Sequence, residues 1–159
     1  GIKSHDAVKT FRDSIHGQGL YKMGLNVAPT CSDCHGVHTI RPAKDTASRT
    51  SKAQISDTCG SCHVGVEKTY AESVHGQVFL KGGADQGKAP VCVDCHSAHS
   101  IERPTSAHFK ATSDQKCGHC HEEPLKHYRE TYHGKAMALG RTTSAPTVAG
   151  RGRRAGWIV

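Results

Sequence analysis

The sequence predicts a mainly α-helical protein with extensive coil and almost no β-structure. Apolar and aromatic residues recur at helical spacing in short stretches, such as Val8, Phe11 and Ile15. The polar segments 41–56 and 81–90 contain Gly or Pro and are typical of loops. The alternation of apolar and polar residues that would favour strands is nearly absent. We therefore expect short helices joined by irregular segments.

Helical spacing also predicts a helix around Tyr70 and Val74, and another from Leu125 to Leu139. Each of the three predicted helices leads to or past a His-Gly pair, whose histidines are His16, His75 and His133. We expect the glycine to end or loosen the helix, because glycine tolerates backbone conformations that other residues avoid. A flat cofactor could then approach the backbone at that point.

All eight cysteines lie in four copies of the motif Cys-x-x-Cys-His, at residues 31–35, 59–63, 92–96 and 117–121. In this motif the two thiols bond to the vinyl groups of one haem, and the adjacent histidine binds the iron. We therefore expect four covalently attached haem c groups. The expected attachment residues are Cys31, Cys34, Cys59, Cys62, Cys92, Cys95, Cys117 and Cys120, and the expected iron ligands within the motifs are His35, His63, His96 and His121.

Other kinds of site also use cysteines at this spacing. Eight cysteines could form two four-cysteine zinc sites, and a redox-active dithiol or a disulfide framework is also conceivable. Neither chemistry needs a histidine directly after the second cysteine, whereas here that histidine follows in all four motifs. The pattern therefore favours haem over zinc, and zinc over disulfides.

The composition is typical of a chain that folds around cofactors. Hydrophobic residues are 35% and aromatic residues 5% of the sequence, which is little for an ordinary packed core. Porphyrin faces would supply the missing apolar surface, so we expect the chain without haem to be largely disordered. The net charge of +7 does not indicate nucleic-acid binding, because the basic residues are scattered and haem propionates would neutralise many of them.

The sequence also bears on location. No apolar run is long enough for a transmembrane helix, and the sequence shows no signal peptide. Because haem c is normally attached outside the cytoplasm, we expect that an export signal has been removed and that the protein is periplasmic or extracellular.

The sequence repeats with a period of about 60 residues. This predicts one tetrahaem domain, residues 1–140, built from two dihaem units at about 14–72 and 73–132, with an extended tail at 141–159. Histidines outside the motifs recur in register: His16, His75 and His133 precede glycine, and His38 and His99 stand three residues after a motif histidine. We expect these histidines to provide the second axial ligands of the irons.

One of these ligands is surplus, because five candidates serve four haems. The short tether of His38 cannot reach the iron bound by His35, so His38 should bind a neighbouring haem. We expect the surplus histidine at an end of the array, His16 or His133, where it suits donation to another molecule, a truncated array or a solvent-facing side chain. His5 could be a ligand or a relic of the repeat. Three histidines are not expected to bind iron: His108, His119 and His127.

These motifs resemble those of multihaem c-type cytochromes over most of the chain. The alternation of Ser-x-His-Gly, Cys-x-x-Cys-His-x-x-His and Cys-x-x-Cys-His is most similar to periplasmic decahaem conduits that feed outer-membrane porins, and to the tetrahaem subunits of extracellular cytochrome filaments. The resemblance implies bis-histidine haems stacked in parallel and T-shaped pairs, wrapped by a chain with little regular structure. In the filament group, one distal histidine can come from the next subunit.

The predicted function is electron transfer in a respiratory or extracellular chain. With two imidazoles on every iron, no position is open for a substrate, so we expect no catalytic residue. Expected partners are a quinol-oxidising membrane cytochrome, a terminal reductase or an outer-membrane conduit, and further copies of the chain in a filament. The alternative is an oxidoreductase that reduces nitrogen or sulfur oxyanions at one open haem, which would need acid–base groups over that haem.

Overall fold

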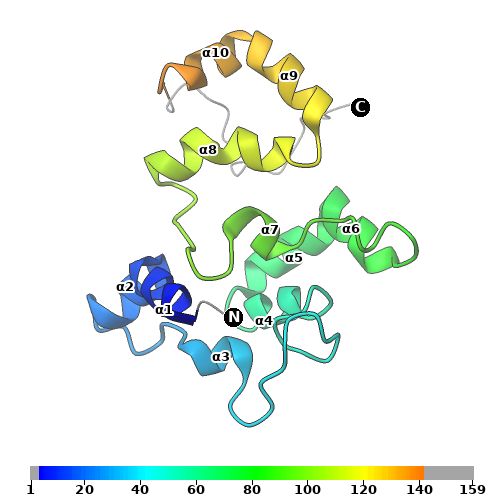
Figure 1. Ribbon diagram of the computed structural model, residues 1–159. Coiled ribbons are helices and arrows are strands. Elements are labelled where there is room, and N and C mark those ends of the chain that lie inside the picture. Colours follow the sequence, from blue (N-terminus) through cyan, green and yellow to red (C-terminus); the bar gives the residue numbers. More distant parts are fainter. Residues whose placement is uncertain (1–3, 142–159) are drawn as a thin grey trace. The chain divides into compact units, whose positions relative to one another are not determined.

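The computed structural model describes residues 4–141, and this part of the chain contains ten helices and no strand (Figure 1). The helices are short and irregular segments join them, which confirms the predicted fold class. The helices are α1 (Ser4–Asp13), α2 (Ile15–Tyr21), α3 (Cys31–His35), α4 (Ile55–Gly60), α5 (Val64–Glu72), α6 (Val74–Lys81), α7 (Cys92–His96), α8 (Ala107–Gly118), α9 (Glu122–Glu130) and α10 (Tyr132–Ala138).

The chain divides into two compact units. Residues 1–102 contain α1 to α7, and residues 103–159 contain α8 to α10. This boundary falls inside the second predicted repeat, so the repeats and the compact units do not coincide. The single domain of residues 1–140 stays a prediction, and residues 142–159 of the predicted tail lie outside the described residues.

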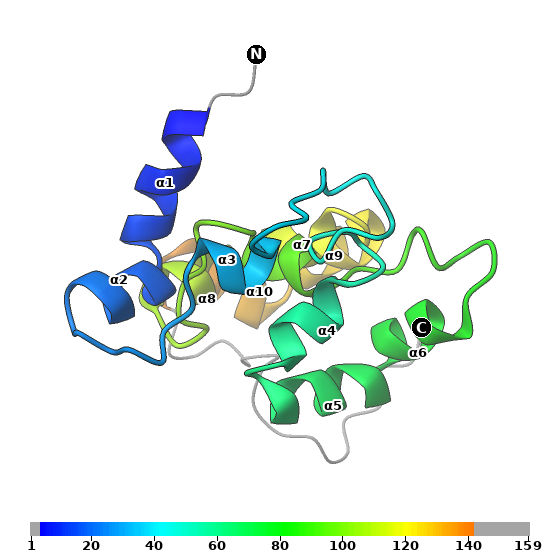
Figure 2. The same ribbon diagram turned by 90° about the horizontal axis from the view of Figure 1, so that it is seen from below.

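Three helix pairs share one architecture: α1 with α2, α5 with α6, and α9 with α10. In each pair one residue with extended backbone separates the helices, and this residue is Ser14, Ser73 or Thr131. Figure 2 shows that α1 and α2 run in different directions on either side of this break. The continuous helices predicted from apolar spacing are therefore each broken in two, because a hydroxyl residue caps the second helix.

The glycines after the histidines do not end these helices, contrary to the sequence-based expectation. Gly17, Gly76 and Gly134 each lie in the first turn of α2, α6 or α10, and each helix continues beyond its glycine. All three glycines are buried. Their role is one of close packing, which is described with the further inference below.

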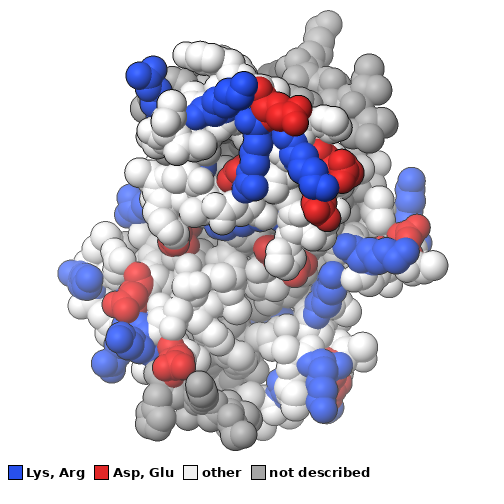
Figure 3. Space-filling model, turned by 45° about the horizontal axis from the view of Figure 1, so that its top comes forward, with Lys and Arg blue, Asp and Glu red and all other residues white. Residues whose placement is uncertain are grey.

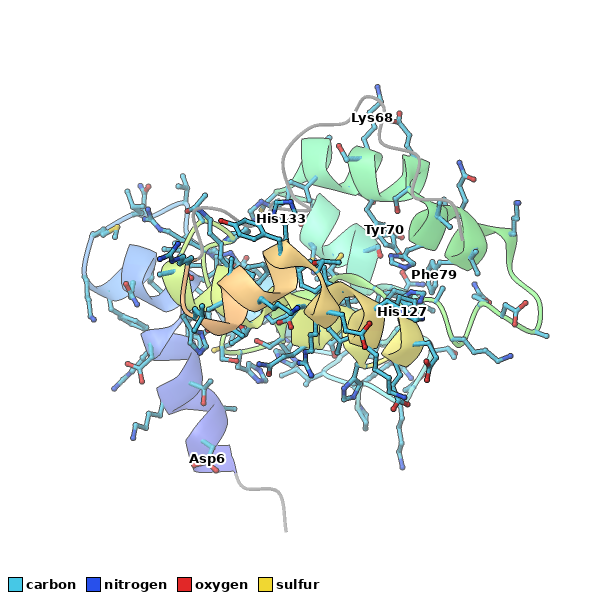
Figure 4. The ribbon with its side chains drawn as sticks, turned by 90° about the horizontal axis from the view of Figure 1, so that it is seen from above. Asp6, Lys68, Tyr70, Phe79, His127 and His133 are labelled. Atoms are coloured by element: carbon cyan, nitrogen blue, oxygen red, sulfur yellow. The ribbon has the colours of Figure 1, made fainter. Side chains whose placement is uncertain are left out.

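The apolar core of the first unit is small. It consists of Ile55, Phe79, Ala89 and Val91, and the partly buried Cys59, Val78 and Val93 pack against it. The Tyr70 hydroxyl on α5 donates to the Pro90 carbonyl oxygen at 3.0 Å, which ties α5 to the segment before α7. Figure 4 shows Tyr70 on α5 and Phe79 on α6. Among residues 103–141 of the second unit, the buried apolar residues are Ala136 and Met137.

Many large apolar side chains are exposed instead. Val27 is 82% exposed, Leu139 78% and Val74 77%, and Val37, Ile40 and Val64 are also exposed. Val64 directly follows the second Cys-x-x-Cys-His motif, and Val37 lies two residues after the first. None of the helices in residues 4–141 is both long and apolar enough to cross a membrane.

Candidate haem-binding sites

Two of the four motifs form short helices of their own. Motif residues 31–35 coincide with α3, and residues 92–96 coincide with α7. In each helix an aspartate between the two cysteines accepts a hydrogen bond from the backbone N–H one residue before the first cysteine. Asp33 accepts from Thr30 at 2.7 Å, and Asp94 accepts from Val91 at 2.7 Å. A carboxylate in the first turn also suits the helix dipole, so these two residues favour a helix without apolar periodicity.

The other two motifs form a junction between helices. Cys59 lies in α4 and Cys117 in α8, and the motif histidines His63 and His121 are the N-cap residues of α5 and α9. The residue after each first cysteine is glycine, where a side chain of the next helix lies close: a Cβ on Gly60 would overlap the Glu67 carboxylate, and a Cβ on Gly118 would overlap Leu125 Cδ2. The glycine therefore lets the two helices pack closely.

All eight thiols are free of disulfide bonds. Cys59 and Cys92, from different motifs, lie together in the first unit: their thiols form a hydrogen bond that lowers the pKa of Cys92 to about 6 and raises that of Cys59. Cys92 Sγ also lies 3.9 Å from Ser56 Oγ. Within residues 4–141 no group of three or more His, Cys, Asp or Glu side chains could hold a metal ion.

A first pair of histidine rings joins the two halves of the first repeat. The His16 and His63 ring centroids lie 5.9 Å apart, and their planes differ by 23°. Two rings in direct face contact would be about 3.5–4 Å apart. An iron about 2 Å from each nitrogen, the usual length of a metal–imidazole bond, would put the centroids about 6 Å apart, since each centroid lies about 1 Å behind its nitrogen. The spacing therefore fits two axial ligands of one iron.

Burial, and next to it the proximity of His63, lowers the pKa of His16. A lower pKa keeps the imidazole neutral at a given pH, and the neutral imidazole is the form that binds a metal. The electrostatics at this ring pair therefore favour the form of His16 that can act as a ligand.

A second pair of histidine rings joins the two repeats. The His35 and His99 ring centroids lie 6.0 Å apart, and their planes differ by 14°. His99 follows α7, the helix of the third motif, whereas His35 ends α3, the helix of the first motif. A histidine three residues after one motif therefore faces the motif histidine of another. The sequence predicts this kind of crossover for His38, which occupies the same place in the first repeat as His99 does in the second.

The remaining predicted ligands take the following positions. His75 and His133 stand in the first turns of α6 and α10, where His16 stands in α2, and Figure 4 shows His133 on α10. His96 ends α7. His38 is exposed in the irregular segment after α3, and its ring belongs to neither ring pair.

The histidines not expected to bind iron lie on helices of the second unit. His108 is in α8, His119 is the C-cap of α8 and His127 is in α9. The backbone of His5 lies in α1, but its side chain is outside the described residues.

Charged side chains of both signs are interspersed on the face shown in Figure 3. In the second unit, Lys126 Nζ lies 3.3 Å from Glu122 Oε1 and 2.7 Å from Glu123 Oε1, and Arg129 Nε lies 3.4 Å from Asp114 Oδ2. The two Lys126 pairs are exposed on both sides and contribute little stability each, about 0–1 kcal/mol. This face therefore carries mixed charge.

Two groups of residues at these sites escaped the sequence-based prediction. The aspartates Asp33 and Asp94 recur at the same place in two motifs, and the hydroxyls of Ser14, Ser73 and Thr131 recur two residues before each His-Gly histidine. Their recurrence in register was the available signal. The structure gives the reason for it, since all of them cap helices at the motifs or at the predicted distal ligands.

The residues present fit haem c. Paired thiols stand beside a histidine in every motif, and two of the motif histidines face a second imidazole at a distance that an iron could bridge. Many exposed apolar side chains could cover porphyrin faces. Residues 25–68 match a family model described as the doubled CXXCH motif, which spans the first two motifs. The chain matches no curated protein and no solved structure.

A doubled Cys-x-x-Cys-His motif is characteristic of multihaem c-type cytochromes. It supports covalent binding of haem c by this chain, and electron transfer as the activity of such a haem protein.

Proposed function

We propose that this chain carries four haem c groups, each bound by two histidines, and that it transfers electrons without transforming a substrate. The two ring pairs carry this proposal: His16 with His63, and His35 with His99. Each pair combines a motif histidine with a histidine that the repeat marks as a distal ligand. A haem iron supplies the redox chemistry by alternating between its ferric and ferrous states.

The protein residues then have three tasks. The eight motif cysteines hold the cofactors covalently, so that they stay at fixed positions. Two imidazoles on each iron favour the ferric state and a low potential relative to His/Met ligation. The same two imidazoles leave no coordination position for a substrate, which favours an electron carrier over an oxyanion reductase.

The proposed location and partners follow from the cofactor. Because haem c is attached outside the cytoplasm, we place the protein in the periplasm or outside the cell. Its electron donors and acceptors would be other redox proteins, such as a quinol-oxidising membrane cytochrome, a terminal reductase or an outer-membrane conduit.

We further propose that copies of the chain associate head to tail, with His38 as the donated ligand. His99 of the second repeat faces His35 of the first repeat. If the pattern continues, the motif histidine of the second repeat, His96, is faced by the equivalent of His99 in a following repeat. In a head-to-tail assembly the first repeat of a second copy would follow, and its equivalent of His99 is His38. His38 is exposed, as donation requires. The ring pair with His63 makes His16 a less suitable donor than expected from the sequence.

The test is electron paramagnetic resonance of the ferric holoprotein across a dilution series. Low-spin haem in concentrated samples is expected, because every iron then has two imidazoles. A high-spin signal that appears only on dilution would support ligand donation between copies, and the variant His38→Ala should show that signal at high concentration as well. High-spin haem in the wild type at every concentration would contradict the bis-histidine carrier and favour the oxidoreductase. Low-spin haem at every concentration would contradict the proposed ligand donation between copies, but not the bis-histidine carrier.

A further inference from the structure

The three breaks between paired helices have the same hydrogen bonds. The side-chain hydroxyl of Ser14, Ser73 or Thr131 donates to a carbonyl oxygen three residues before it, at 2.6 Å in each case. The hydroxyl oxygen itself accepts a hydrogen bond from the backbone N–H of the glycine three residues after it, at 3.1 Å in each case. One hydroxyl thus bonds to the end of the first helix and to the start of the second.

The glycine completes the arrangement. A Cβ on Gly17 would overlap the Phe11 carbonyl oxygen, and Gly76 and Gly134 stand in the same relation to the carbonyl oxygens of Tyr70 and Tyr128. The backbone of the second helix therefore lies directly against the end of the first. We call each set of aromatic carbonyl, hydroxyl and glycine a hydroxyl–glycine clamp.

The histidine lies between the two parts of the clamp. In the first clamp, His16 is preceded by Ser14 at the N-cap and followed directly by Gly17. Both neighbours are buried and hydrogen-bonded, so the backbone that carries the imidazole has little freedom to rotate. The His16 ring is also one of the two rings that face each other at iron-bridging distance. His16 thus combines a backbone held by hydrogen bonds with a ring that is paired with His63.

We propose that Ser14 is a positioning residue for His16, and that Ser73 and Thr131 have the same role for His75 and His133. The clamp holds the imidazole at the iron and so keeps the sixth coordination position closed. This inference rests on the proposed bis-histidine function and adds the device that maintains it. Sequence repetition alone does not require this role, because a helix cap could equally serve stability only.

The test compares the holoprotein with the variant Ser14→Ala. Carbon monoxide binds reduced haem only when a distal histidine leaves, so its rate of uptake reports how often the histidine dissociates. Loss of the cap should raise the rate at one haem by on the order of tenfold, which matches the typical contribution of an N-cap. All haems should stay attached, because their cysteines are unchanged. The variant His16→Ala gives the upper limit of the uptake rate, because the iron that His16 serves then always has an open coordination position.

A matched control is Ser51→Ala. Ser51 and Ser14 are both 3% exposed, and the Ser51 hydroxyl donates to the Thr46 carbonyl oxygen at 3.2 Å, but no histidine follows it in a clamp. This control should lose thermal stability without faster uptake. Ser14→Thr should restore slow uptake, because threonine occupies the same place in the third clamp.

Equal uptake in Ser14→Ala, Ser51→Ala and the wild type would overturn the positioning role while leaving the bis-histidine proposal intact. Fast uptake by the wild type in concentrated samples, at the level of His16→Ala, would instead contradict the bis-histidine proposal itself. If Ser14→Ala does not fold, Ser73→Ala is the second variant, and the same comparison then applies to the haem that His75 serves.

Discussion

The two histidine ring pairs reach almost the same geometry from different backbones. His16 stands in the first turn of a helix, between a capping serine and a buried glycine. His99 stands in an irregular segment, three residues after His96, which ends α7. The ring separations are nonetheless 5.9 and 6.0 Å. Local helix capping holds His16, whereas His99 is held by a short irregular segment that follows the third motif helix.

The largest expected effect is that of His99→Ala, which removes the ring facing His35. One ferric haem should become high-spin, because its iron then has a single imidazole. The haem should remain attached, since the motif cysteines are unchanged. Electron paramagnetic resonance measures the spin state, and haem staining of the denatured protein measures attachment.

The matched control is His38→Ala, the same position in the first repeat. In a dilute sample it should change neither the spin state nor attachment, because the exposed His38 ring belongs to neither ring pair. If His99→Ala leaves all haem low-spin, the ring pair does not mark the ligands of one iron.

A smaller effect is expected for Gly17→Ala, which disturbs the ring pair of His16 and His63 by displacing the backbone next to His16. The new Cβ would overlap the Phe11 carbonyl oxygen, so α1 and α2 must separate. We expect a loss of about 1–3 kcal/mol in the free energy of unfolding, as for other forced overpacking, and a partial high-spin signal. Thermal unfolding of the holoprotein followed by circular dichroism measures the loss.

Gly65→Ala is the control for this substitution. Gly65 lies in α5, and nothing is within 4 Å of a Cβ placed on it. This variant should be neutral or slightly more stable, because alanine favours the helix. Equal behaviour of the two variants would mean that the close approach at Gly17 does not hold the histidine.

The smallest effect is expected for Ser97→Gly, on the segment that leads to His99. Ser97 has φ 61° and ψ 176°, a region almost restricted to glycine. The same position in the first repeat is Gly36, with φ 82° and ψ 173°. Glycine should relieve the strain and raise the free energy of unfolding by about 1 kcal/mol, measured by thermal unfolding. Destabilisation would indicate that the Ser97 side chain is needed, for instance for its hydroxyl contact with Ser100 at 2.7 Å.

The sequence predicts the chemistry of the sites, whereas it does not predict their backbone. The motif spacing predicts all eight cysteines as attachment residues, and repeat register predicts His16 and His99 as ligands. The structure places the rings of these two histidines opposite motif histidines. The helical class could also be predicted, because apolar residues recur at helical spacing. The prediction of His75 and His133 as ligands rests on register and on their helix positions.

Other features could not be read from spacing. The helices α3 and α7 depend on a carboxylate cap rather than on apolar periodicity, so apolar spacing does not predict them. The glycines after the histidines serve close packing between helices, which a local interpretation of glycine as a helix end misses. The contact of Cys59 with Cys92 joins two motifs 33 residues apart, and only tertiary packing decides it.

The packing of Cys59 against the small core of the first unit matters for protein engineering. Cys59 lies beside the cluster of Ile55, Phe79 and Val91, whereas its counterpart in the second repeat, Cys117, is exposed. The two motifs are therefore not interchangeable as places to remove a cofactor. A variant with fewer haems should lose the motif at residues 117–121 and keep the motif at residues 59–63. In the latter, the attachment residue Cys59 also packs against the apolar core.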